Sequence, residues 1–257
     1  PSILPFDAPN RRQIAQGHPS DWRPPRPKDG YDLVVLGGGP AGLTAAITAA
    51  KAGHAVAMVE RNLTGGTCVN FGCTPSKSLL RAARAVYQAR DGQKFGYALQ
   101  ADPRVDFAAV MTRVREMRAF SGSFDAVSVA AGAGIDVFLG DGRFVGPDAV
   151  EVDGQRLRFR KALIATGSGP AVPDLPGLAA AAYLTNETVF ELTELPRRVV
   201  CIGAGIVHCE LAQALRRLGS EVDLVGSGDR LLPSEAPAAS DLLAERRAHE
   251  LEAGAPG

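Results

Sequence analysis

Short apolar runs predict the strands of an α/β fold. Residues 31–36 are apolar on both faces, as buried strands of a parallel sheet are, and residues 161–165 predict another buried strand. Residues 54–59 and 198–202 predict two further strands. Strong helix formers with apolar residues at helical spacing occupy several of the intervals. They predict helices over residues 43–50, 76–90 and 105–132, and a further helix that ends at Leu218.

Three other segments have patterns of their own. Four short apolar runs separated by Gly, Pro and Asp predict a small β-meander over residues 137–138, 143–145, 150–152 and 157–159. Residues 1–30 contain seven prolines and few apolar residues, which predicts an extended arm that runs over a surface, with Trp22 as its anchor. Pro170, Pro173 and Pro176 predict a stiff connector between two domains.

The first apolar run leads directly into the glycines of residues 37–42. Gly37 allows a tight turn, Gly39 lets the backbone approach a pyrophosphate, and Gly42 lets the helix pack on the strand. The helix N-terminus then offers free N–H groups to phosphates. Glu60 ends the next strand, where it is placed to accept hydrogen bonds from an adenosine ribose. The motif predicts a dinucleotide site. The alternative is a glycine-rich turn in another α/β fold, and it requires that Glu60 stands at the position of the ribose-binding acid by coincidence.

A second motif repeats the first at a constant offset of 166 positions (203 − 37 and 205 − 39). Gly203 and Gly205 are present, but His208 replaces the third glycine and Gly226 replaces the ribose acid. An imidazole at the point where helix and strand pack requires a wider separation or an outward rotamer. The missing acid indicates either a phosphorylated ribose, with Ser227 or Arg230 nearby, or weak binding, and both alternatives stay open.

Two cysteines lie between a glycine pair and a predicted helix. Thr74 is a suitable N-cap residue and Pro75 suits the first helical position, so Cys73 would lie just ahead of a helix N-terminus. That position favours a thiolate, and Cys68 would provide a second thiol for disulfide exchange. The alternatives are buried small hydrophobic residues or half of a metal site. The latter lacks a second Cys/His pair at ligand spacing, so we predict no metal site.

Composition narrows the setting. The 257 residues suffice for two domains, 46% are hydrophobic, 22% are charged, and the formal net charge is zero. Nothing in this balance favours nucleic acid or anionic lipid as a partner. Glycines and Pro40 interrupt the apolar stretch 33–50, so we predict no membrane span, and the start lacks a signal-peptide pattern. Four cysteines with one plausible pair favour a reducing cytoplasm.

With these motifs in view, the chain resembles the FAD-dependent pyridine nucleotide–disulfide oxidoreductases, and its mercuric reductase-like members most. Residues 65–77 resemble the redox-active disulfide signature, and residues 165–167 (Ala-Thr-Gly) resemble the motif that closes the FAD domain. Residues 198–233 resemble the start of the NAD(P) domain. Residues 10–22 are similar to an N-terminal extension of some mercuric reductase-like members.

The resemblance implies a role for each matching position. Cys73 would face the flavin, Cys68 would attack the external substrate, and Lys77 would pair with Glu210 near the flavin N5. Without the family, Lys77 and Glu210 read as ordinary solvated helix charges. The residues that would bind FAD are Gly37, Gly39, Pro40, Ala41, Gly42, Glu60, Arg61, Gly66, Thr67, Lys77, Thr166 and Gly167, and those for NAD(P)H are Gly203 and Gly205.

The expected organisation is an N-terminal arm (residues 1–30), an FAD-binding domain with the redox disulfide (31–170) and a partial NAD(P)-binding domain (171–257). The fold class is α/β, with two Rossmann-like units, a small β-meander and an incomplete second unit. Family members form homodimers through a later domain, which also supplies a catalytic His–Glu pair and is not found here. The chain therefore reads as a fragment, a truncated product or a degenerate copy.

Three functions are consistent with these features. In the first, electrons pass from NAD(P)H through FAD to a Cys68–Cys73 disulfide and on to a disulfide or metal-ion substrate. The second is a catalytically incomplete FAD-binding remnant, and the third is a flavin-dependent thiol or NAD(P)H oxidase. An unfinished second sheet with an open edge also predicts poor solubility or pairing with another chain.

Overall fold

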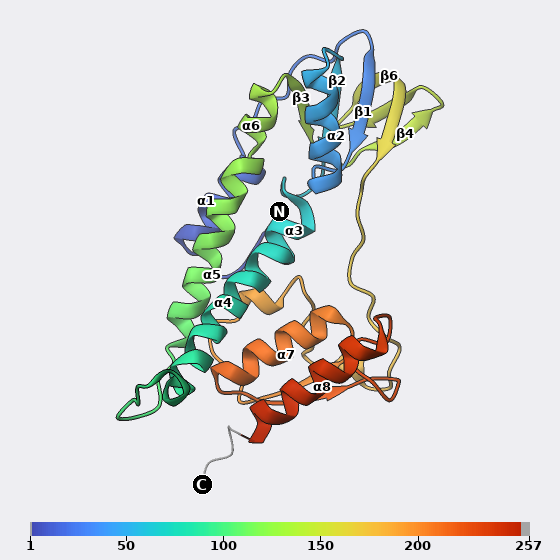
Figure 1. Cartoon of the computed structure of the whole chain (residues 1–257). Coiled ribbons are helices and arrows are strands. Elements are labelled where there is room, and N and C mark those ends of the chain that lie inside the picture. Colours follow the sequence, from blue (N-terminus) through green and yellow to red (C-terminus); the bar gives the residue numbers. More distant parts are fainter. Residues whose placement is uncertain (1, 253–257) are drawn as a thin grey trace. The chain divides into compact units, whose positions relative to one another are not determined.

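The computed structural model describes residues 2–252, and the side chains of residues 2–245 (Figure 1). It confirms the α/β class, with parallel strands and helices alternating along the chain. The described chain forms two compact units, one from residues 2–75 and 111–192 and the other from residues 76–110 and 193–252. The predicted domain limits at residues 31, 170 and 257 remain predictions.

A six-stranded sheet is the centre of the first unit, with strand order β3-β2-β1-β6-β5-β4. The strands are β1 (Tyr31–Leu36), β2 (Val56–Glu60), β3 (Ile135–Leu139), β4 (Arg143–Gly146), β5 (Ala149–Val152) and β6 (Gln155–Ile164). β1 pairs in parallel with β2 and β6, and β2 pairs in parallel with β3. The carboxyl ends of the parallel strands therefore lie at one edge of the sheet.

The predicted meander is only partly correct. Residues 137–138 belong to β3, a strand of the parallel sheet. Residues 157–159 and 161–164 form one strand, β6, whose first half pairs antiparallel with β5 and whose second half pairs in parallel with β1. No glycine or proline separates the two halves, so nothing in the backbone ends the strand at Arg160.

Helices cover the sheet of the first unit, and α2 contacts β1 and β2 (Figure 1). The helical elements are α1 (Ala8–Gly17), α2 (Pro40–Lys51), α3 (Gly66–Phe71), α5 (Phe107–Gly122, of which the first four residues belong to the second unit), α6 (Val127–Gly132), and the short 3₁₀ turns η2 (Ser123–Asp125), η3 (Leu178–Ala180) and η4 (Val189–Glu191). The single helix predicted over residues 105–132 was wrong. Its path is broken at Ala126, whose backbone is extended (φ −61°, ψ 150°).

The extended arm that the prolines predict over residues 1–30 is only partly correct, because residues 8–17 form the helix α1, whereas residues 18–30 contain no helix or strand. Asp7 caps α1 by accepting a hydrogen bond from the Asn10 N–H, and Pro9 lies in the first turn, where its missing N–H is not needed. Ile3 and Gln13 are buried, with 1% and 0% of their surface exposed. The predicted anchor is confirmed, because the Trp22 indole N–H donates to the Val137 carbonyl (3.0 Å).

The second unit contains a parallel pair of strands, β7 and β8, within the part of the chain that the structure describes. Its elements are α4 (Cys73–Arg90, from Ser76 onward), η1 (Gly92–Phe95), β7 (Arg198–Ile202), α7 (Ile206–Leu218), β8 (Glu221–Val225) and α8 (Pro237–Glu252). The apolar stripe of α7 is buried, including Ala212 and Leu215. Every second residue of β7 and of β8 is exposed. Among these residues, Val200 on β7 is 59% exposed and Val225 on β8 is 54% exposed.

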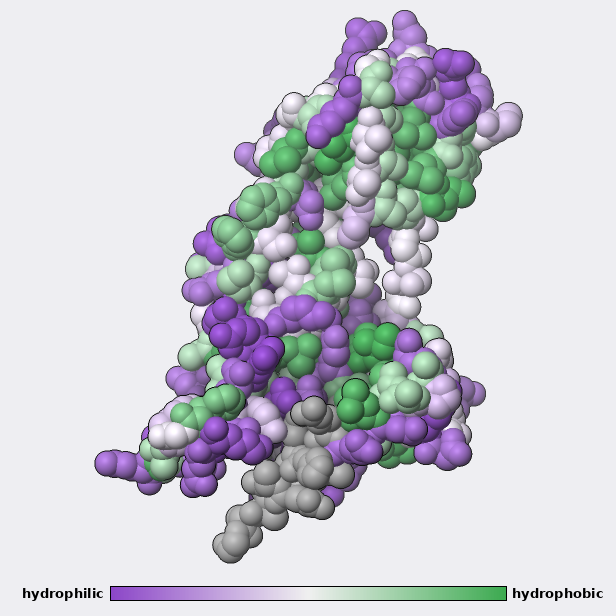
Figure 2. Space-filling model, viewed as in Figure 1, coloured by the Kyte–Doolittle hydropathy of each residue, from purple (hydrophilic) through white to green (hydrophobic). Residues whose placement is uncertain are grey.

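Hydrophilic and apolar residues are interspersed over both units on the face that Figure 2 shows. No helix among residues 2–252 combines the length and apolar character that crossing a membrane requires.

Candidate active site

The glycines after β1 are required by the backbone. Gly37 has a φ of +108°, and a Cβ there would lie 2.2 Å from the Ala165 carbonyl oxygen on the neighbouring chain segment. A Cβ at Gly42 would lie 1.8 Å from the Gly37 carbonyl oxygen. Both contacts exclude any side chain, so the loop turns tightly and α2 begins close to the strand.

Glu60 holds this loop from the end of β2. Its carboxylate is buried and accepts hydrogen bonds from the Gly38 N–H (2.5 Å) and the Asn62 N–H (2.6 Å). The sequence predicts only a contact with ribose, and the structure adds this bond to the glycine loop. The same carboxylate faces a cavity, so a ligand hydroxyl can share it.

The cavity has a volume of about 610 Å³, within the range of roughly 300–1,000 Å³ typical of small-molecule sites. Ten of its 22 lining residues are predicted cofactor-binding residues, and Cys68 adds a predicted catalytic residue. The ten are Gly37, Gly39, Pro40, Ala41, Glu60, Arg61, Gly66, Thr67, Thr166 and Gly167. Gly42, Cys73 and Lys77 do not line it. Other lining residues were not predicted: Asn62 and Leu63 directly follow Arg61 but carry no motif, whereas Asp141 and Glu187 lie on separate segments that only the fold brings together.

The glycine loop and the cysteine-bearing segment touch in this cavity. Gly66 has a φ of +56°, and a Cβ there would lie 2.6 Å from the Gly39 Cα. The close approach of these two glycines leaves an open backbone surface beside the α2 N-terminus. Such a surface suits a dinucleotide pyrophosphate, which takes hydrogen bonds from backbone N–H groups.

The cysteines lie on two consecutive helices. The segment around Cys68 forms α3, a helix that the sequence analysis did not predict, and Gly72 separates it from α4. α4 begins at Cys73 itself, so Thr74 is inside the first turn and is not the N-cap that we predicted. A Cβ at Gly72 would lie 2.9 Å from the Thr67 carbonyl oxygen, which explains why glycine occupies this sharp turn.

The structure brings the two thiols together in the reduced state. Cys68 is partly buried, Cys73 is exposed, and a side-chain hydrogen bond joins them. Burial, followed by the hydrogen bond with Cys73 and its charge, raises the pKa of Cys68 to about 11. Cys68 therefore holds its proton at neutral pH.

One acidic residue near the thiols was missed by the sequence analysis. Burial raises the pKa of Asp125, which lies on η2, and the charge of this carboxylate contributes to the raised pKa of Cys68. A hydrogen bond of 3.4 Å between the hydroxyls of Thr74 and Ser121 joins the start of α4 to the end of α5 just before η2. No local motif marks Asp125, because its position depends on the break between α5 and α6.

Within the second unit, the Lys77 ammonium contacts both carboxylate oxygens of Glu210 at 2.7 Å. The pair joins α4 to α7, and no local motif in the sequence links these two helices, because the two residues are 133 positions apart. Its predicted role beside a flavin remains a prediction.

The backbone of the second glycine loop resembles that of the first, but a side chain, that of His208, packs against it. Gly203 has a φ of +130°, and Gly205 precedes α7 in an extended conformation. The His208 ring lies against this loop, since a Cβ at Gly203 would be 2.5 Å from its Cε1. The buried Nδ1 of His208 has no hydrogen-bond partner among the described residues. The imidazole thus lies over the loop itself.

The described residues contain a second cavity but no metal-binding cluster. No three His, Cys, Asp or Glu side chains there are grouped closely enough to hold a metal ion. A smaller cavity of about 220 Å³ is lined by residues between Ala89 and Asp102.

These features define an α/β protein with a dinucleotide-type glycine loop and a dithiol at one cavity. Residues 31–251 match the family described as pyridine nucleotide-disulphide oxidoreductase. The chain belongs to this oxidoreductase family.

Curated relatives and solved structures agree with this assignment. The chain is 37% identical over 214 residues to a mercuric reductase of Lysinibacillus sphaericus, covering 83% of this chain and 39% of the relative. It is 41% identical over 204 residues to a mercuric reductase of Streptomyces lividans, covering 76% of this chain and 42% of the relative. It thus spans about two fifths of these relatives.

A flavoprotein disulfide reductase from Escherichia coli, RclA, which is induced by HOCl, has a similar structure. Its TM-score is 0.73 and its sequence identity 28%, and the match covers 86% of this chain and 47% of that chain.

Proposed function

We propose that this chain carries the FAD site and redox-active disulfide of an NAD(P)H-dependent oxidoreductase acting on a disulfide or a metal ion. The observation that carries the proposal is the contact between Cys68 and Cys73 beside a cavity built from a dinucleotide-type glycine loop. The names of the mercuric reductase and disulfide reductase relatives support both substrate classes.

The residues fit an FAD molecule. The glycines at positions 37 and 39 and the N-terminus of α2 would hold the pyrophosphate, and Glu60 would accept the ribose hydroxyls. Arg61, Gly66, Thr67, Thr166 and Gly167 would complete the walls. When bound, FAD would supply two-electron transfer between NAD(P)H and the Cys68–Cys73 disulfide.

The cysteines would carry out the thiol chemistry. Reduction of the Cys68–Cys73 disulfide adds two electrons and two protons and gives the two thiols seen here. Cys68, after losing its proton, attacks one sulfur of a substrate disulfide, and the other sulfur leaves as a thiol. Cys73 then displaces the second substrate thiol and restores the Cys68–Cys73 bond.

The second unit would bind the nicotinamide nucleotide. Gly203 and Gly205 keep the backbone of a phosphate-binding turn ahead of α7. We propose the predicted limits, residues 31–170 for FAD and 171–257 for NAD(P), as the functional division. A homodimer is the assembly that the family resemblance implies, and the use of cysteine favours a cytoplasmic setting.

A second candidate is a protein that holds FAD but does not turn over with nicotinamide nucleotides. His208 over the second glycine loop and Gly226 in place of an acid favour it. The third alternative, an oxidase, would use the same front half and has no separate structural support.

A visible absorption spectrum of the purified chain tests the proposal. We expect bound flavin that NADPH or NADH bleaches. Flavin that dithionite reduces but neither nucleotide reduces would favour the second candidate, and a chain that binds no flavin would contradict both.

The cysteine chemistry has its own test. Cys73→Ser is expected to abolish turnover of disulfide substrates, whereas Cys201→Ser, which changes a cysteine on β7, serves as the control. In the reduced protein, alkylation of Cys68 is expected to accelerate as pH rises towards about 11, because burial and Cys73 raise its pKa. Full turnover by Cys73→Ser would contradict the assigned chemistry.

A further inference from the structure

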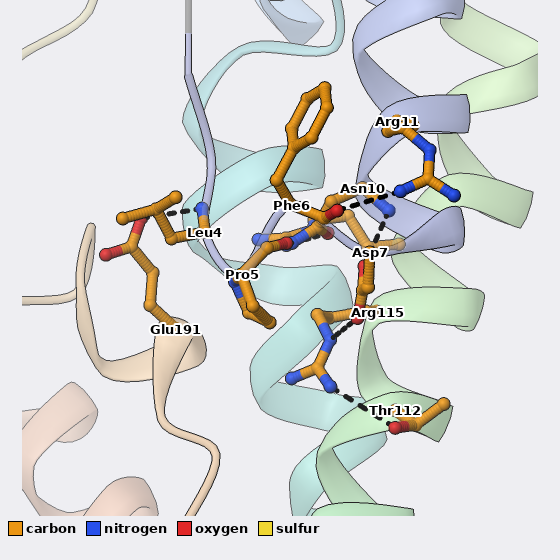
Figure 3. Close-up of polar contacts among 10 residues, drawn as sticks. Leu4, Pro5, Phe6, Asp7, Asn10, Arg11, Thr112, Arg115 and Glu191 are labelled. Carbon is orange, nitrogen blue, oxygen red and sulfur yellow. Dashed lines mark hydrogen bonds and ion pairs between the residues drawn. The ribbon is translucent and has the colours of Figure 1, made fainter.

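The N-terminal segment is fastened to the first unit by polar side chains (Figure 3). Asp7 accepts a hydrogen bond from the Arg115 Nε on α5 at 2.6 Å, and Arg115 also donates to the Thr112 hydroxyl at 3.2 Å. The Leu4 N–H donates to the Glu191 carboxylate at 3.0 Å. These bonds hold the start of α1 against α5 and η4.

The middle of α1 faces the cysteine-bearing helix instead. Gln13 has no exposed surface, and its Nε2 donates to the Asn70 Oδ1 on α3 at 2.7 Å. Its side chain also crosses α5 at Gly122, where a Cβ would lie 2.0 Å from the Gln13 Oε1. Only glycine at this point of α5 leaves room for the amide.

Asn70 connects this contact to the cysteine. It is fully buried, two residues after Cys68, and its Nδ2 donates to the Thr64 carbonyl (3.1 Å) and the Gly66 carbonyl (2.9 Å). One amide therefore ties together the loop before α3, the first turn of α3 and, through Gln13, the helix α1.

Arg118 closes the network from α5. Its side chain is 1% exposed, one Nη donates to the Asn70 backbone carbonyl (3.0 Å), and the other donates to the Asn10 Oδ1 (2.5 Å). Burial lowers the pKa of Arg118 to about 10, so the guanidinium is still charged at neutral pH. A positive charge at the carbonyl end of a helix stabilises it.

The dependence of α3 on these bonds follows from its length. α3 has six residues, and a helix that short does not form alone in water, so tertiary contacts must hold it. The backbone carbonyl and the side-chain amide of Asn70, in its last turn, both bond to side chains that α5 and α1 supply. Loosening those bonds would free Cys68 relative to Cys73.

We propose that Gln13, Asn10 and Arg118 are positioning residues, through which the N-terminal helix sets the effective concentration of Cys68 towards Cys73. This inference rests on the proposed function for the identity of the redox pair. It assigns the N-terminal segment a part in thiol chemistry. Arg118 is central to the network because it donates hydrogen bonds to both α3 and α1.

The experiment compares two buried arginines of α5 in the 257-residue chain. Arg118 donates to α3, whereas among the described residues Arg115 donates hydrogen bonds to Asp7 and Thr112 and not to α3, so Arg115→Met is the matched control for Arg118→Met. Gln13→Leu is the milder second variant. Each chain is equilibrated with reduced and oxidised glutathione: Cys68 and Cys73 lose two electrons and two protons, and one oxidised glutathione becomes two reduced ones. Alkylation and mass spectrometry measure the fraction of disulfide.

We expect Arg118→Met and Gln13→Leu to lower the equilibrium constant for disulfide formation about tenfold, since each removes buried hydrogen bonds that hold α3. Arg115→Met is expected to change it less than about twofold, even where urea unfolding shows a comparable loss of stability. Equal shifts in Arg118→Met and Arg115→Met, or no shift in Gln13→Leu, would overturn the inference.

The readout uses no flavin. FAD binding to the same proteins is measured separately by absorbance, so a chain that binds no flavin would contradict the proposed function and leave this thiol measurement standing.

Discussion

The two glycine loops have the same backbone and differ in what fills them. Gly39 and Gly205, which precede α2 and α7, have nearly identical dihedral angles (φ −80°, ψ −176° and φ −77°, ψ 178°). Gly37 and Gly203 both have positive φ and both donate to the end of the next strand, to Val59 (2.8 Å) and Val225 (2.7 Å). The repeat is therefore one of structure as well as sequence.

The side chains at the loop have been exchanged. In the first loop, Gly38 faces Glu60, and a Cβ on Gly38 would lie 3.3 Å from the Glu60 Cβ. In the second, Ala204 stands at the position of Gly38 and Gly226 at the position of Glu60, with a Cβ on Gly226 only 2.8 Å from the Ala204 Cβ. The gap between loop and strand end thus accommodates one side chain, an acid in the first unit and a methyl group in the second.

The strongest way to break the first loop is Gly42→Ala. Because the new Cβ would lie 1.8 Å from the Gly37 carbonyl oxygen, α2 must move away from β1. We expect loss of flavin binding and a decrease in unfolding free energy of roughly 3 kcal/mol, measured by urea titration. Gly132→Ala is the control, since no described atom beyond the neighbouring backbone of its own helix lies within 4 Å of its new Cβ. Comparable losses in both variants would contradict the packing argument.

A sharper comparison comes from His208→Gly, which restores the first loop's third glycine in the second. Removing the ring from Gly203 opens the backbone to a phosphate, so we expect NADPH or NADH to bind about tenfold more tightly by calorimetry. His208→Ala should give a similar gain, since it also removes the ring and the second loop, unlike the first, already accommodates a Cβ at this position. Weaker binding in both would show that the imidazole holds the nucleotide.

The exchanged side chains predict a coupled pair. Gly226→Glu alone is expected to destabilise the second unit, because its Cβ meets Ala204, and Ala204→Gly should relieve the contact. In the double variant we expect the preference for NADH over NADPH to rise roughly fivefold, about the worth of one ribose hydrogen bond. Additive effects on stability would mean that positions 204 and 226 do not share one gap.

Local rules explain what the sequence could predict. Short apolar runs mark the strands near residues 31–36, 54–59 and 198–202, and the backbone at Gly37 and Gly203 has positive φ, so each signal lies within a few residues. The cysteine pair was likewise recognised from one short segment. Half of the cavity-lining residues, eleven of 22, followed from the same motifs.

Long-range contacts explain what it could not. α3 and α1 depend on bonds between residues far apart in the sequence, such as Gln13 with Asn70 and Asn10 with Arg118. The break at Ala126 and the joining of two predicted strands in β6 also depend on tertiary neighbours. Asp125 lies near the thiols only because the helix is interrupted at η2 and Ala126.

The smallest expected effect concerns the helix that follows the second loop. Glu210 on α7 pairs with Lys77, whose side chain is 60% exposed, and exposed pairs contribute little. A double-mutant cycle with Lys77→Met and Glu210→Gln should give a coupling of about 0.5–1 kcal/mol by urea unfolding. The control pair in the same unit, Arg198 and Glu221, is exposed on both sides at 3.4 Å and should give a coupling near zero.

That small coupling separates two roles for the pair. If Lys77→Met slows flavin reduction far more than Arg198→Met while its stability coupling stays small, the ammonium acts on the flavin, as the family resemblance implies. If flavin reduction is unchanged, Lys77 and Glu210 are only a surface link between α4 and α7. A large coupling, near that of a buried pair, would contradict the exposure on which this prediction rests.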